Sequence, residues 1–160
     1  MHPSVDRQPK SAARAIRLPS KLLLVSWFAL AASGLTAAQE ADSAAKELLG
    51  AWRLVEFVGG DDTRLAPSDR SKYEIRFDRD GSVVVRLDCN RGRGAWTSSA
   101  AGRLTLGPLA LTRAMCPDMT VHDRVARDWS SVASYVLRDG RLFLSLAADG
   151  GAYEFEPVAP

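Results

Sequence analysis

The sequence contains little of the chemistry on which most enzymes depend. It has two histidines and two cysteines in 160 residues, and His122 is the only histidine after the N-terminal region. A zinc site takes three or four ligands, and a serine or cysteine nucleophile needs a base beside it. No Gly-x-Ser-x-Gly motif is present, and Ser98, Ser99, Ser130 and Ser131 have no obvious partners. We therefore predict that the chain is not an enzyme and has no catalytic residue, metal ion or cofactor.

The chain also lacks an apolar run long enough to cross a membrane. Its clearest run, at 22–32, is 11 residues long, whereas a spanning helix takes about 20. Basic residues precede this run and Thr36-Ala37-Ala38 follows it, an arrangement typical of a secretory signal. We predict that residues 1–38 are a signal peptide cleaved after Ala38, that no membrane span remains, and that the mature protein is periplasmic or secreted. The alternative is an uncleaved membrane anchor; no nearby cysteine would allow lipid modification.

Neither sign of charge dominates the chain. It has 21 basic and 19 acidic residues, and residues 1–38 contain five of the basic residues but only one acidic residue. Residues 39–160 therefore have a net charge of −2 with histidine neutral. A mildly acidic domain has no electric field that would attract nucleic acid, so we expect no nucleic-acid partner.

Cys89 and Cys116 are the only cysteines, and both follow the predicted signal peptide. An oxidising compartment favours pairing, and an even count leaves no free thiol. In the chain-entropy model, closing a loop of this length stabilises a fold by roughly 3–4 kcal/mol. A metal pair and a catalytic thiol are the competing interpretations, but His122 would be the only imidazole available to either. We predict a disulfide.

Alternating apolar and polar residues predict a strand-rich domain at 48–158, after a short polar spacer at 39–47. Residues 73–77 and 83–87 alternate with period two on either side of Asp80-Gly81, which predicts a hairpin. Further strands are predicted at 52–58, 95–97, 104–106, 142–146 and 153–155, with Asp-Gly turns at 139–140 and 149–150. About seven or eight short strands are expected in all.

One segment departs from the strand pattern. Residues 120–134 contain no glycine or proline, and an apolar stripe at helical spacing predicts a helix. The stripe consists of Val121, Val125, Trp129, Val132 and Val136. Thr120 with Asp123 resembles a capping box, Asp118 is a second candidate cap, and His122 is expected on the solvated face. The predicted fold class is α+β, with a strongly bent antiparallel sheet or partial barrel and one packed helix at about residues 120–134.

Several motifs together resemble one known family. Residues 49–54, Leu-Gly-Ala-Trp-Arg-Leu, are similar to the opening motif of the META domain family, which includes HslJ-like heat-shock proteins. Cys89-Asn90-Arg91 with Gly94, and the segment 107–117, are similar to the later motifs of that family. The resemblance covers roughly residues 48–156. Asp88 stands where the family usually has glycine, and Asp123 stands where it has glutamate.

The resemblance implies a small α+β domain, a disulfide between Cys89 and Cys116, and a location in the cell envelope. It supplies no catalytic residue, because the family has no established reaction. Structural roles are expected for the remaining motif residues, namely Trp52, Asn90, Gly94, Pro108, Thr112, Arg113 and Pro117. Among these, Arg113 is expected to bond carbonyl groups near the bridge, and Asn90 suits a turn or a left-handed backbone.

For three groups of residues, a functional role is an alternative to the structural role that we expect. The arginines of Arg91-Gly92-Arg93-Gly94 could grip a carboxylate or phosphate, although a solvated turn is the expected interpretation. Three tryptophans could line a ligand cavity, although core packing is expected of large aromatic residues in such a domain; they are Trp52, Trp96 and Trp129. Acid–base chemistry would require the fold to bring together carboxylates such as Glu56, Asp88 or Asp123.

The sequence therefore favours a non-enzymatic exported domain that supports stress tolerance in the envelope. We expect it to act as a monomer that binds an envelope protein or a small apolar ligand. A secreted inhibitor or virulence-associated interaction module is the alternative, and an uncharacterised hydrolase is a third hypothesis.

Overall fold

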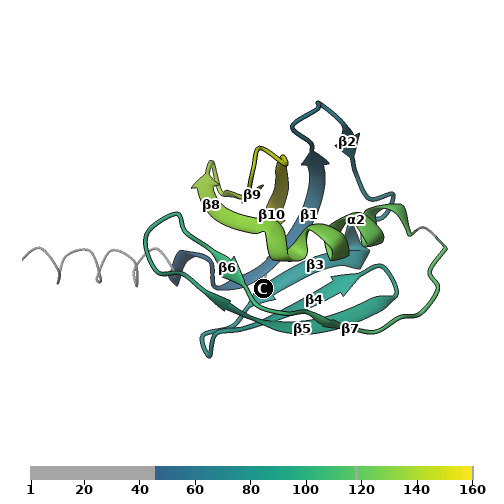
Figure 1. Ribbon diagram of the computed structural model, residues 1–160. Coiled ribbons are helices and arrows are strands. Elements are labelled where there is room, and N and C mark those ends of the chain that lie inside the picture. Colours follow the sequence, from purple (N-terminus) through teal and green to yellow (C-terminus); the bar gives the residue numbers. More distant parts are fainter. Residues whose placement is uncertain (1–45, 118, 160) are drawn as a thin grey trace, which may run out of the picture. The chain divides into compact units, whose positions relative to one another are not determined.

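The computed structural model describes residues 46–117 and 119–159, so the predicted signal peptide lies outside the described residues. Strands make up far more of the described chain than helices do (Figure 1). The elements are β1 (Gly50–Val58), β2 (Arg64–Leu65), η1 (Arg70–Lys72), β3 (Tyr73–Phe77), β4 (Ser82–Leu87), β5 (Asn90–Thr97), β6 (Thr105–Leu106), β7 (Ala110–Leu111), α2 (Thr120–Asp128), η2 (Trp129–Ser131), β8 (Val132–Arg138), β9 (Arg141–Leu146) and β10 (Ala152–Pro157). Here η marks a short 3-10 helix. Within the described residues, no helix has the length and apolar character that crossing a membrane requires.

The strands form one antiparallel sheet in the order β6-β5-β4-β3-β1-β10-β9-β8, with β2 beside β1 and β7 beside β5. The two ends of this order meet, because the segment before β6 bonds to β8. Leu104 N–H donates to the carbonyl of Ala133 at 3.3 Å, and Tyr135 N–H donates to the carbonyl of Gly102 at 2.9 Å. The result is a nearly closed barrel with one short helix, so the helical share is smaller than the α+β prediction implies.

The predicted hairpins form where the alternation and the Asp-Gly pairs place them. β3 pairs with β4 in a register that sets Ile75 opposite Val85, and both side chains are buried. β8 and β9 are joined at Asp139-Gly140, where both residues have positive φ, 54° and 72°. A two-residue turn with this backbone matches the twist of the flanking strands, and Asp-Gly tolerates it well.

The helix is shorter than predicted. α2 ends at Asp128, the chain turns through η2, and β8 begins at Val132. Four of the five stripe residues are buried, whereas Val136 lies on β8 and is 52% exposed. Ending the helix early lets β8 pair with β9, and its valines are residues that favour strands. The capping prediction is also wrong, because Met119 is the N-cap and makes no capping bond with its side chain; Asp118 lies outside the described residues.

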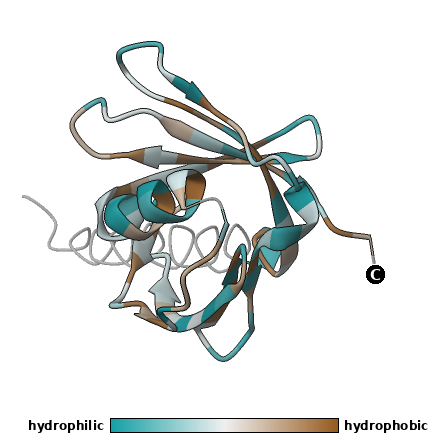
Figure 2. Ribbon diagram, turned by 90° about the vertical axis from the view of Figure 1, so that its right-hand side faces the viewer, coloured by the Kyte–Doolittle hydropathy of each residue, from teal (hydrophilic) through white to brown (hydrophobic). Residues whose placement is uncertain are grey.

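Helix α2 lies against the open side of the barrel and closes the core. Figure 2 shows hydrophobic residues on one side of the helix and hydrophilic residues on the other. Its buried valines, Val121 and Val125, join Trp129 and the inward side chains of the sheet in one core cluster. Leu48, just before β1, is fully buried in the same cluster, so ordered packing starts at the predicted domain boundary.

Candidate functional site

The most elaborate polar arrangement in the described residues surrounds the disulfide. Cys89 and Cys116 are bonded, with their Cα atoms 5.8 Å apart, within the usual range for such a bridge. Cys89 is exposed in the turn between β4 and β5, whereas Cys116 is buried ahead of α2. The bridge therefore ties a sheet turn to the segment that leads into helix α2.

The turn at Asp88 explains how the chain departs from the family motif at this position. Asp88 has φ of 54°, in the left-handed region that glycine favours and aspartate tolerates. It is buried, its N–H donates to the carbonyl of Lys72 at 2.9 Å, and its carboxylate lies 3.4 Å from Lys72 Nζ. These contacts hold the left-handed turn without a glycine.

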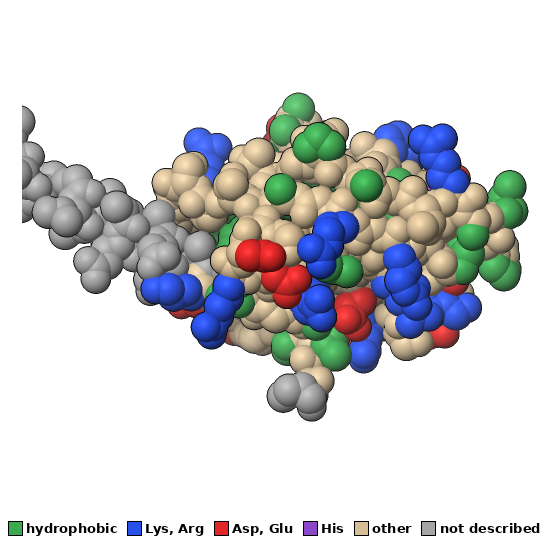
Figure 3. All heavy atoms as spheres, turned by 90° about the horizontal axis from the view of Figure 1, so that it is seen from below, with side chains coloured by type: hydrophobic (Ala, Val, Ile, Leu, Met, Phe, Trp, Pro, Cys, Tyr) green, Lys and Arg blue, Asp and Glu red, His purple; other side chains and the backbone are tan. Residues whose placement is uncertain are grey.

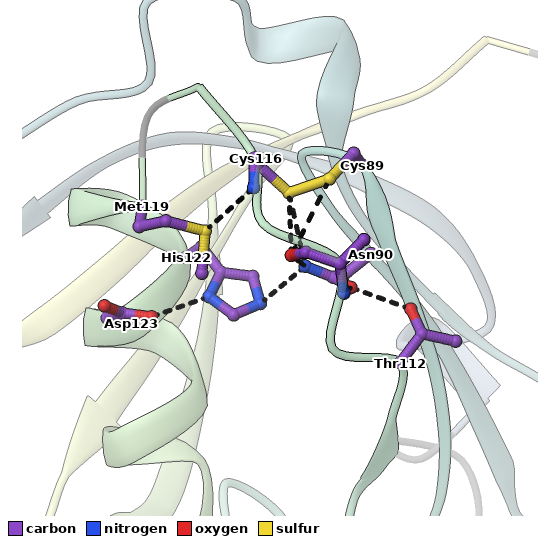
Figure 4. A network of polar contacts seen from close by, with 8 residues as sticks. Cys89, Asn90, Thr112, Cys116, Met119, His122 and Asp123 are labelled. Atoms are coloured by element: carbon purple, nitrogen blue, oxygen red, sulfur yellow. Dashed lines mark hydrogen bonds and ion pairs between the residues drawn. A yellow bond between two sulfur atoms is a disulfide. The ribbon is translucent and has the colours of Figure 1, made fainter.

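Asn90 is the centre of the arrangement and is fully buried at the start of β5 (Figure 4). Its side-chain oxygen accepts from Ala114 N–H at 2.7 Å and from Thr112 Oγ1 at 2.9 Å. Its amide nitrogen donates to Ala114 O at 2.9 Å and lies 3.2 Å from Cys116 Sγ. Because a backbone N–H can only donate, these contacts fix which end of the amide faces which partner. Asn90 is therefore a buried clamp in extended backbone, not the turn residue that the sequence suggested.

His122 joins this network from helix α2, and its predicted solvent exposure is wrong. The side chain is buried, with Nε2 lying 3.3 Å from the amide nitrogen of Asn90 and Nδ1 lying 2.9 Å from the carboxylate of Asp123. Since the Asn90 amide nitrogen can only donate, Nε2 accepts and Nδ1 carries the proton. His122 follows Val121 on a helix face that is wider than the predicted stripe, which is why it turns inward.

An open groove of about 500 Å³ lies beside this network. Its apolar wall is formed by Leu109, Leu111, Met115, Met119 and Ala126. Two charged side chains, Arg113 and Asp123, also line it. Met115 is 89% exposed, the most exposed large hydrophobic side chain among the described residues. No local sequence pattern predicts this groove, because its walls come from the segment after β6 and from one side of α2.

Arg113 does not have the role that we predicted for it. It is exposed and makes no hydrogen bond or ion pair with any other described residue. The carbonyl of Ala114 near the bridge is bonded by Asn90 instead. Of the other motif residues, Thr112 donates to Asn90 and accepts from Arg91 N–H, whereas Pro108 and Pro117 are exposed.

Arg91-Gly92-Arg93-Gly94 lies within strand β5, so the predicted turn is wrong. The two glycines face inward, where the segment at 107–111 crosses closely. A side chain at Gly92 would place its Cβ 2.9 Å from the carbonyl oxygen of Ala110, and one at Gly94 would place it 3.0 Å from that of Pro108. The glycines therefore serve close packing, and Arg91 and Arg93, which alternate with them, are exposed.

The interior of the barrel is filled. Trp52, Trp96 and Trp129 are all buried, and their indole N–H groups donate to the carbonyls of Leu48, Asp78 and Gly107. The cavity between helix and sheet, bordered by Trp129 and Phe155, holds about 20 Å³, room for about one water molecule. The tryptophans are core residues, and this cavity of the described chain has no space for a small-molecule ligand.

The acidic residues that an enzyme would have needed are not brought together. Glu56 pairs with Arg64 at 2.9 Å, Asp88 with Lys72, and Asp123 with His122. No contact joins any two of these carboxylates in the described chain. Nor do the residues at 46–117 and 119–159 contain a group of three histidine, cysteine or acidic side chains that could hold a metal ion.

Sequence reasoning missed a second, partly buried cluster, at the other end of α2. Arg124 Nε donates to Asp128 at 2.6 Å, and its guanidinium lies 4.1 Å above the centre of the Phe57 ring. The hydroxyl of Tyr153 donates to the same carboxylate at 2.7 Å. Burial, followed by this hydrogen bond, raises the pKa of Tyr153 far above its usual range. The cluster fastens α2 to β1 and β10, and only its i,i+4 Arg–Asp spacing was visible in the sequence.

Comparison with known proteins places this chain in one family. The model of the META domain family matches residues 46–159. An NMR structure of a protein from Burkholderia xenovorans is similar to the chain, with a TM-score of 0.61, 18% identity, and coverage of 74% of this chain and 88% of that one. A crystal structure of a DUF4847 family protein from Bacteroides vulgatus matches with a TM-score of 0.51, 13% identity, and coverage of 68% and 92%. Both likenesses concern the fold alone. No curated protein matches the sequence significantly.

Proposed function

Because this chain belongs to the META domain family, we propose that it is an exported, non-enzymatic domain that supports stress tolerance in the cell envelope by binding a protein partner. The basic and apolar opening at 1–38 supports export, and so does a disulfide, which persists in oxidising compartments. The dispersed carboxylates and the filled barrel support a binding role over a catalytic one.

The groove beside the disulfide is the observation that carries the binding role. Exposed methionines are common at surfaces that bind varied partners, because the side chain is flexible and polarizable. Met115 and Met119 line this groove, and Met115 is almost fully exposed. Arg113 adds one unpaired positive charge to the wall. The fitting partner is a protein segment that places an apolar side chain against the methionines and a carboxylate beside Arg113.

A small apolar ligand is the second candidate, and the groove favours it over the interior. The volume of about 500 Å³ lies within the range of small-molecule sites, roughly 300–1,000 Å³. The buried cavity, by contrast, would accommodate only about one water molecule.

A photocrosslinking amino acid at position 115 tests the proposal directly. Cells that express the full chain would be exposed to heat, irradiated and fractionated, and crosslinked proteins would be identified from the envelope fraction. We expect one envelope protein to crosslink at position 115 and to be absent when position 136 carries the crosslinker. Val136 is the matched control, because it is the other exposed large hydrophobic residue in the described chain and lies on β8.

Complementation of a deletion strain provides the functional readout. We expect Met115→Glu to lower survival after heat as much as the deletion does, and Val136→Glu to restore it. A protein that stays full-length in the cytoplasm would contradict export. Equal survival with both variants, without a specific crosslink at position 115, would contradict the groove as the binding site.

A further inference from the structure

The outer face of strands β3, β4 and β5 carries a concentration of arginine that the net charge of the chain does not suggest. The strand register sets Arg86 opposite Arg91, and it sets Val84 between Arg76 and Arg93. Arg91 and Arg93 are two residues apart on one strand, so they point to the same side, roughly 7 Å apart. Four guanidinium groups thus share one side of a rigid sheet, which we call the arginine face: Arg76, Arg86, Arg91 and Arg93. Figure 3 views the molecule from this side, where basic side chains spread across the surface with acidic ones between them.

The acidic neighbours do not neutralise this face. Asp78 pairs with Arg76 at 3.1 Å, and Glu74 stands opposite Arg86 in the register. Asp80, in the turn beyond β3, is held mainly by hydrogen bonds from Ser82, with a smaller effect from the charge of Arg93.

The arginines of β5 have no internal partners. Their side chains are exposed and make no hydrogen bond or ion pair with the residues at 46–117 or 119–159. Arg86 donates only to the carbonyl of Asp88, at 3.3 Å. Neither Arg91 nor Arg93 therefore has a direct ion pair in the described chain. The four arginines outnumber the nearby carboxylates of Glu74, Asp78 and Asp80, so the face keeps a net positive charge.

Packing explains the glycines of this strand but not its arginines. Gly92 and Gly94 are required because the segment at 107–111 crosses within 3.0 Å of where their Cβ atoms would lie. On the outer side, like charges directly opposite each other on neighbouring strands destabilise a sheet. Arg86 opposite Arg91 is such a pair. An external anion that bridges them would remove this repulsion.

We propose that the arginine face binds the phosphate groups of an anionic lipid membrane surface. Arginine presents a planar fork that matches phosphate in a bidentate manner. Neighbouring strands lie about 4.8 Å apart, so the four arginines form an extended array across three strands. Such an array fits a layer of repeated head groups better than a single small anion. Val84 lies between Arg76 and Arg93, and Ala95 stands opposite Ser82 beyond Arg93. These short side chains allow the sheet to approach a flat surface closely. The export proposed above would bring the domain to a membrane surface in the cell envelope. The binding itself depends only on the folded domain.

Vesicle co-sedimentation tests the proposal with the protein purified after expression of the full chain. Binding to phosphatidylcholine vesicles would be compared with binding to vesicles that also contain phosphatidylglycerol, at low and at high salt. Each arginine near an anionic membrane surface strengthens binding by roughly fivefold. We therefore expect Arg91→Gln with Arg93→Gln to weaken binding to the anionic vesicles by roughly 25-fold. Binding of the unchanged protein should fall steeply with salt and be absent on neutral vesicles.

The control variant carries Arg127→Gln with Arg138→Gln. It removes the same charge from exposed positions on α2 and β8, outside the arginine face, and should bind as the unchanged protein does. Thermal melts of both double variants should match the unchanged protein, because all four side chains are exposed.

Two results would overturn the proposal. The first is no binding to anionic vesicles, or equal weakening by both double variants. The second is binding to polyglutamate that depends on Arg91 and Arg93 without any binding to vesicles, which would assign the face to an acidic protein. Neither result touches the groove at Met115, so failure here is distinguishable from failure of the proposed function.

Discussion

The side-chain amide of Asn90 lies 3.3 Å from Nε2 of His122 and 3.2 Å from Sγ of Cys116, so one buried residue connects strand β5, helix α2 and the disulfide. The disulfide alone would hold two points of the chain together. Asn90 also fixes the orientation of the segment 112–114, because its side-chain oxygen and nitrogen each bond to particular groups of that segment. The backbone beside the groove is therefore held rigidly. This favours specific binding, because fewer groups of the protein lose conformational freedom when a partner binds.

Replacing Asn90 with alanine should lower the free energy of unfolding by about 1–3 kcal/mol, since buried polar groups lose their hydrogen-bond partner. Asn90→Asp should destabilise at least as much at neutral pH. It keeps the shape of the side chain but turns the donor that faces Ala114 O into an acceptor. Urea denaturation measures both effects.

Thr112→Ser is the matched control for Asn90, because it keeps the hydroxyl that donates to the amide oxygen. Its urea midpoint should stay close to that of the unchanged protein. An Asn90→Ala variant as stable as the unchanged protein would show that the amide network adds nothing beyond the disulfide.

The two cysteines should behave differently once separated. Cys116→Ser leaves Cys89 as an exposed thiol, and Cys89→Ser leaves Cys116 as a buried one. A thiol reagent should therefore label the folded Cys116→Ser variant much faster, and both variants should label alike in denaturant. Each should lose about 2–5 kcal/mol of stability, as expected on removing a native disulfide. Equal labelling rates in the folded state would mean that Cys116 is accessible.

Arg113→Ala should change the free energy of unfolding by less than about 0.5 kcal/mol, the usual range for an exposed residue without partners. Arg124→Ala is the informative comparison. It removes a 2.6 Å bond to Asp128 and a guanidinium stacked 4.1 Å from the Phe57 ring, and should cost about 1–3 kcal/mol. A large loss on changing Arg113 would restore the bridge-binding role that its place in the motif suggested.

Much of the sheet could be predicted from local patterns. The alternation around Asp80-Gly81 and the pair Asp139-Gly140 specify hairpins through backbone preferences and one buried face, both of which are properties of neighbouring residues. The end of the helix could not be predicted in the same way. Whether the chain continues as α2 or turns into β8 depends on whether β9 is available as a partner, and β9 lies further along the sequence.

The candidate site was less accessible to sequence reasoning. Asn90 lies 22 residues before Thr112 and 32 residues before His122, and only the folding of the barrel brings it into contact with both. The prediction for His122 rested on the usual exposure of such residues, and the prediction for Asn90 rested on its preference for turns. Both preferences yield where buried hydrogen-bond partners are available. Arg91 and Arg93 were noticed as a possible anion grip, but the register that adds Arg86 beside them is a property of the folded sheet.

Alkaline pH should lower the free energy of unfolding, and part of that loss should depend on the hydroxyl of Tyr153. Burial, and after it the bond to Asp128, raises the pKa of Tyr153 far above the value of about 10 expected in the unfolded chain. Below pH 10 the phenol is protonated in both states, so the stabilisation is fully present. Above pH 10 only the unfolded phenol ionises, and the free energy of unfolding falls by up to about 1.4 kcal/mol per pH unit from this residue.

Tyr153→Phe should be less stable than the unchanged protein at pH 8, because the bond to Asp128 is lost. It has no phenol to ionise, however, so its stability should fall less steeply between pH 9 and pH 11. Urea midpoints at several pH values should therefore converge as the pH rises. A difference that stays constant over this range would mean that Tyr153 ionises equally in the folded and unfolded states. In that case the bond to Asp128 would not hold the phenol proton, and arginines, chiefly Arg124, would anchor that carboxylate.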